Sequence, residues 1–83
     1  MPYIKAEQRH DIMIEGRSPC TPGELNFVLT KVVCRYIHER GLSYTTANEI
    51  VGTLDACKLE FYRRIVVPYE QCKQEENGDV SDL

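Results

Sequence analysis

The chain has 83 residues, a formal net charge of −3 and 42% hydrophobic residues. A domain of this length buries little apolar surface, so it needs cross-links, a metal or further chains for stability. The four cysteines form no CxxC pair, and the acidic balance argues against a general nucleic-acid-binding protein. No leader-like start and no stretch of about 20 apolar residues is present. We therefore expect a cytoplasmic protein with reduced thiols, no metal, no cofactor and no membrane contact.

Residues 1–20 are expected to form an irregular N-terminal arm. Residues 5–11 favour one or two helical turns, and residues 12–14 form a short apolar stretch. Gly16 and Pro19 then indicate a turn.

The first clear helix start lies at Thr21. This residue offers an N-cap hydroxyl, Pro22 follows at the first helical position, and Glu24 completes a capping box. The pattern predicts a helix over residues 22–40 that ends at Gly41.

A second helix is predicted over residues 44–67. Ser43 or Thr45 provides its N-cap. Pro68 lacks an amide hydrogen and is expected to end or kink this helix, with a short helical segment continuing through Glu75. The chain then divides into the arm, a hairpin with a kinked extension over residues 21–75, and a flexible acidic tail over residues 76–83.

The short connection between the two long helices predicts an antiparallel helix hairpin and hence an all-α fold. Each helix carries more apolar surface than its partner can cover, and an exposed patch of this kind is normally an interface. We expect a compact helical homo-oligomer, either a dimer or a tetramer, with Leu59 or Val66 in the interface.

No motif of a catalytic site is present. The sequence contains no GxSxG, no glycine-rich phosphate loop, no HExxH and no Cys–His pair at a known spacing. The sequence therefore predicts a protein that is not an enzyme.

Two stretches combine cations with aromatic rings, the groups needed to bind phosphate and to stack against a base. Lys58 falls within the apolar stripe of the second helix, where it either extends to solvent or binds an anion at a subunit groove. Ordinary amphipathic packing is the alternative for all of these residues. The candidate ligand-binding residues are Tyr3, Lys5, Arg9, Lys58, Tyr62, Arg63 and Arg64.

Gly52 lies in the middle of the second predicted helix, where glycine costs about 1 kcal/mol relative to alanine. Its presence indicates close approach by another backbone or by a ligand, and helix packing is the favoured interpretation.

The chain resembles a family of short proteins common in phage and prophage genomes. The resemblance covers most of the chain between Pro22 and Val80. The stretches that carry it are Met1-Pro-Tyr-Ile, Pro22-Gly-Glu-Leu-Asn-Phe, Gly41-Leu-Ser-Tyr, Asn48 with Gly52-Thr-Leu, Lys58-Leu-Glu-Phe-Tyr-Arg-Arg, Pro68-Tyr-Glu, Lys73 and Glu76-Asn-Gly-Asp-Val.

This resemblance implies a phage accessory protein in the cytoplasm of an infected bacterium. Small phage proteins of this build include sponges of the anti-CBASS type, which sequester a cyclic nucleotide immune signal at subunit interfaces. We therefore expect a sponge for a cyclic dinucleotide or related nucleotide. The alternative is an adaptor or inhibitor that binds a host or phage protein through its apolar helical surface.

Overall fold

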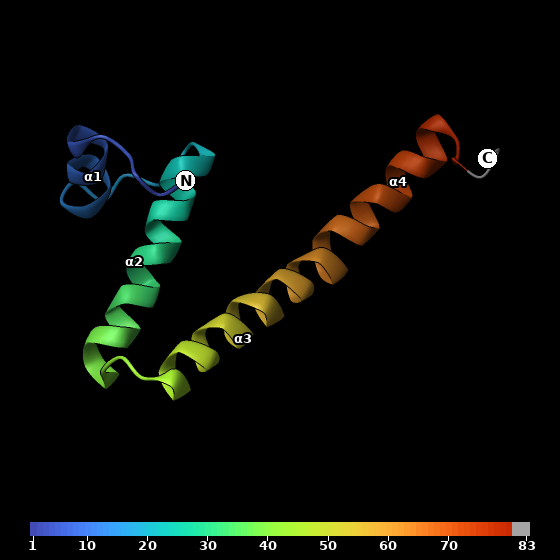
Figure 1. The fold of residues 1–83 in the computed structure, drawn as a ribbon. Coiled ribbons are helices and arrows are strands. Elements are labelled where there is room, and N and C mark those ends of the chain that lie inside the picture. Colours follow the sequence, from blue (N-terminus) through green and yellow to red (C-terminus); the bar gives the residue numbers. More distant parts are fainter. Residues whose placement is uncertain (81–83) are drawn as a thin grey trace. The chain divides into compact units, whose positions relative to one another are not determined.

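The computed structural model describes residues 1–80, and all regular secondary structure in that part is helical (Figure 1). The all-α fold class is thereby confirmed. Residues 81–83, the end of the predicted acidic tail, lie outside the described residues. The elements in chain order are α1 (Ala6–Met13), α2 (Pro22–Arg40), α3 (Tyr44–Phe61), the π-helical segment η1 (Tyr62–Val66) and α4 (Val67–Asn77).

The chain forms two compact units, and each is described by itself. The first is Met1–Thr46, and the second begins at Ala47, after the first turn of α3.

Helix α2 has the bounds that its capping residues predict. The Glu24 amide donates to Thr21 Oγ1 at 3.1 Å, which satisfies one of the amides that a helix start leaves unpaired. At the other end Gly41 adopts φ 82°, a conformation that favours glycine, and its amide donates to the carbonyl of Ile37.

The N-terminal arm is more ordered than the sequence predicts. The expected helical turns are confirmed as α1, which extends to Met13, so residues 1–20 are not irregular throughout. Helix α1 lies beside the N-terminal half of α2 (Figure 1). The arm also crosses the start of α2 closely. A Cβ atom on Gly23 would lie 3.1 Å from the carbonyl oxygen of Met1, so glycine permits this approach.

Of the two outcomes expected at Pro68, an end or a kink of the second helix, the structure excludes the end. Helix α3, η1 and α4 follow one another without a break from residue 44 to residue 77, as the continuous yellow-to-red ribbon in Figure 1 shows. Ser43 is the N-cap, because its Oγ accepts a hydrogen bond from the Thr46 amide at 3.1 Å.

A π-helical turn accommodates the proline. Pro68 cannot donate to the carbonyl of Arg64, and its ring crowds that carbonyl in a regular α-helix. In η1 the Val67 amide donates instead to the carbonyl of Tyr62, five residues earlier. One additional residue in this turn therefore lets the helix continue. It ends at Asn77, within the predicted tail, where Gly78 has φ 90°.

Burial differs sharply between the units. Phe27 in α2 is 7% exposed and is the one buried hydrophobic residue among those described. The two other buried side chains, Glu24 and Thr46, are polar and lie in the same first unit. From Ala47 to Val80 no described residue is buried, although this part carries many large apolar side chains. The second unit therefore has no hydrophobic core of its own.

Gly52 shows no close neighbour: a Cβ atom built there would meet no atom within 4 Å. We expect Gly52→Ala to raise the free energy of unfolding by up to about 1 kcal/mol, because alanine restricts the unfolded chain and favours the helix. Urea denaturation followed by circular dichroism at fixed protein concentration measures this change. A destabilised variant would show instead that another backbone approaches Gly52 in the assembled protein.

Candidate functional site

A hydrogen-bonded polar cluster in the first unit surrounds Glu24. Arg17 donates to both carboxylate oxygens, at 2.8 and 3.0 Å. Gln8 Nε2 donates at 2.8 Å, the Cys20 amide at 3.0 Å and the Cys20 thiol at 3.2 Å. Glu24 thus accepts five hydrogen bonds and is only 3% exposed. This carboxylate ties α1 and the loop that follows it to the start of α2.

The charges of this cluster stabilise one another. The Arg17 guanidinium, the Cys20 amide and Gln8 together hold the pKa of Glu24 far below its usual range, and the hydrogen bond to Glu24 raises the pKa of Arg17. The carboxylate of Glu24 is the acceptor in all of these hydrogen bonds, and a protonated carboxyl would direct its own hydrogen at one of the donors. The cluster is therefore satisfied only while Glu24 is ionised. Both carboxylate oxygens of Glu24 already accept hydrogen bonds from the same unit, which indicates a structural role.

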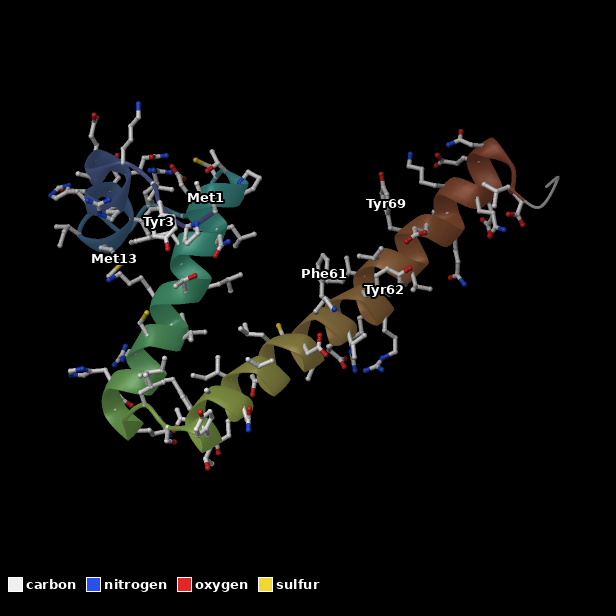
Figure 2. All side chains as sticks on the ribbon, in the orientation of Figure 1. Met1, Tyr3, Met13, Phe61, Tyr62 and Tyr69 are labelled. Atoms are coloured by element: carbon white, nitrogen blue, oxygen red, sulfur yellow. The ribbon has the colours of Figure 1, made fainter. Side chains whose placement is uncertain are left out.

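Three of the predicted ligand-binding residues lie in the first unit. Tyr3 is exposed and lies with Met1 beside the start of α2 (Figure 2). The backbone amide of Lys5 donates to Gln8 Oε1 at 2.7 Å at the start of α1, and Lys5 is exposed. Arg9 Nη1 donates to the carbonyl of Ile4 at 2.7 Å, and Arg9 remains exposed.

The other four predicted residues lie on the long helix of the second unit. Lys58 does not bury its ammonium: its side chain is exposed, and Nζ lies 3.1 Å from Asp55. Arg63 and Arg64 both bind the carboxylate of Glu60. A ligand phosphate would have to compete with these carboxylates.

 Both contacts are local, since Glu60 precedes Arg63 by three residues and Arg64 by four.

Tyr62 is the first residue of η1 and is half exposed. It contributes to an open hollow of about 570 Å³ along α4, together with Glu70, Lys73 and Asp79. A second open hollow of about 660 Å³ lies between Met13 of α1 and Val28, Lys31 and Arg35 of α2. Both are wide surface depressions, and the first is lined by more carboxylates than cations. Of the predicted ligand-binding residues, only Tyr62 lines either of these two hollows, and neither hollow is enclosed.

The residues that organise the first unit were not evident from the sequence as a cluster. Glu24 is identifiable as a capping residue, but Arg17 and Gln8 show no motif that links them to it. The only sequence signal is weak: Arg17 precedes the helix start at Thr21 and lies seven residues before Glu24.

Among the described residues, no group of three or more His, Cys, Asp or Glu side chains is arranged to hold a metal ion. No helix in residues 1–80 is long and apolar enough to cross a membrane.

These features define a small all-α protein with an anchored N-terminal arm and a long helix that exposes its apolar side chains. The chain belongs to the family described as a domain of unknown function, DUF6899, whose model matches residues 1–80. No curated protein and no solved structure matches the chain.

Proposed function

We propose that the protein is a non-enzymatic adaptor or inhibitor that works as a homo-oligomer and binds another protein through the apolar surface of its long helix. The observation that supports this most directly is the absence of any buried residue between Ala47 and Val80 among so many large apolar side chains. Exposed apolar surface on this scale is typical of interaction sites.

The proposal includes an antiparallel hairpin of α2 and α3. Only residues 41–43 connect the two helices, and a connection of this length favours helices that fold back on each other. The hairpin covers one stripe of the long helix, and the remaining apolar surface is left for other chains.

Sequestration of a nucleotide signal is the second candidate. It is supported by the exposed cations and aromatic ring at Lys58, Tyr62, Arg63 and Arg64, which lie within two turns of helix. A phosphate-bearing ligand at this position requires walls from a second subunit, and it must displace Asp55 and Glu60 from the cations. The resemblance to phage accessory proteins is compatible with either candidate, because fold alone does not determine function.

Native mass spectrometry of the purified protein, alone and with a panel of cyclic dinucleotides, distinguishes the two candidates. The adaptor proposal predicts an oligomer with no bound nucleotide. A bound nucleotide whose mass is lost from the Lys58→Ala/Arg63→Ala double variant, with the oligomer intact, would favour sequestration instead.

A monomer at micromolar concentration would overturn the proposed homo-oligomer. The adaptor role has its own control: Leu59→Asp should abolish capture of a protein partner from a bacterial lysate, while the conservative Leu59→Met should retain it. Equal capture by both variants would place the binding surface elsewhere.

A further inference from the structure

The π-helical turn keeps one apolar stripe of the long helix in phase. From Ala47 through Ile50, Leu54 and Cys57 to Phe61, apolar residues follow at spacings of three and four, the pattern of a helix-packing seam. Beyond Phe61 the stripe continues at Ile65, Tyr69 and Cys72 with spacings of four, four and three. We call Phe61, Ile65, Tyr69 and Cys72 the distal seam.

The additional residue matters because of helix geometry. In an uninterrupted α-helix the eight residues from Phe61 to Tyr69 turn about 80° beyond two full turns, which would move Tyr69 off the stripe. The wider turn of η1 takes up one residue and removes most of this rotation. Phe61 and Tyr69 accordingly project from the same side of the helix (Figure 2). All four side chains of the distal seam are exposed.

Helix α2 is too short to cover the distal seam. It has 19 residues, whereas α3, η1 and α4 together have 18, 5 and 11, or 34 in all. At 1.5 Å per residue these lengths are about 28 Å and about 51 Å, so a fully closed hairpin reaches about as far as Phe61 and leaves about 15 residues uncovered, with Ile65, Tyr69 and Cys72 among them. Within the arm, Ile12 and Met13 already line a hollow with Val28 and Val32 of α2. The part of the distal seam beyond the reach of α2 is therefore available to another chain.

The charges along this part of the helix favour a second copy in the opposite direction. Residues 58–66 carry three cations against one carboxylate, a net charge of +2, and residues 70–79 carry four carboxylates against one cation, a net charge of −3. In a parallel pair, stretches of like charge lie side by side. An antiparallel pair places each basic stretch beside an acidic one, and a two-fold axis makes both contacts at once.

We infer that the distal seam is the self-association surface of the protein, and that two copies pair there in antiparallel orientation across a two-fold axis. This inference rests on the proposed homo-oligomer and assigns its interface. This assignment replaces the expectation that Leu59 lies in the oligomer interface. Leu59 and Tyr62 lie outside the seam, so their exposed apolar surface stays available to a different partner.

A matched pair of variants of the full chain tests the position of the interface. Ile65 and Leu59 are 58% and 56% exposed, and only Ile65 lies in the seam. We expect Ile65→Asp to weaken self-association at least about a hundredfold, because a carboxylate would be buried without a partner. Leu59→Asp should leave the association constant within about threefold. Sedimentation equilibrium measures both constants, and circular dichroism verifies that each variant remains helical.

Charge reversal tests the orientation. Arg63→Glu with Arg64→Glu should weaken the dimer about tenfold, and adding Glu75→Lys with Glu76→Lys should restore it. Loss without rescue would exclude the antiparallel arrangement. An intact oligomer in Ile65→Asp would refute the seam while leaving the proposed homo-oligomer standing, whereas a monomeric parent protein would refute both.

Discussion

Glu24→Gln is expected to lower the thermal unfolding midpoint by about 5 °C or more at neutral pH. Glutamine has nearly the same shape, but its NH₂ group is a donor that would face the donors of Arg17, Gln8 and Cys20. The variant also leaves the Arg17 guanidinium without its carboxylate partner. Thermal denaturation by circular dichroism measures the midpoint, and faster trypsin cleavage after Arg17 would show that the arm has come away from α2.

The matched control is Glu39→Gln, which removes the same charge from the same helix. Glu39 is exposed and lies 3.6 Å from Arg35, and exposed pairs contribute little. This control should change the midpoint by less than about 2 °C. Equal effects of the two substitutions would show that net charge, and not the cluster around Glu24, determines stability.

The effect of Glu24 also has a defined pH dependence. Because the pKa of Glu24 is lower in the folded protein than in the unfolded chain, its stabilisation is complete above the unfolded value of about 4.3 and is lost as the pH falls below it. The difference between the parent protein and Glu24→Gln should therefore shrink progressively below about pH 4. A difference that stayed constant down to pH 2 would contradict this assignment.

Phe27→Ala is expected to lower the free energy of unfolding by about 3 kcal/mol, the cost of removing a buried phenylalanine and leaving a cavity. Phe27 is the one buried hydrophobic side chain in residues 1–80, so no other large side chain in the first unit compensates for its loss. Urea denaturation measures the change. Leu29→Ala provides the control on the same helix. Leu29 is 50% exposed, and its truncation should cost less than about 1 kcal/mol. If both variants lost the same stability, the burial of Phe27 would not be what stabilises this unit.

The candidate site was only partly predictable. The sequence predicts cations and aromatic rings together at residues 58–64, because their spacing along one helix sets which of them lie close together. The ion pairs of these cations with Asp55 and Glu60 each lie within about one turn of helix and follow from the same spacing. Ion pairs at these spacings compete with any external anion. Whether residues of the arm and of the long helix share a ligand depends on contacts between chains, for which one sequence contains no local signal.

The sequence by itself determined both ends of α2 and the start of α3. Thr21, Gly41 and Ser43 act on backbone groups within four residues of themselves, so their effects follow from local chemistry. Only the tertiary structure decided that Glu24 anchors α1, because its contact with Gln8 spans 16 residues and depends on the path of the arm. The outcome at Pro68 is visible only in the structure, although its cause is local. The local loss of one hydrogen bond favours a helix end, but a single π-helical turn restores pairing for the neighbouring amide and lets α4 continue the helix.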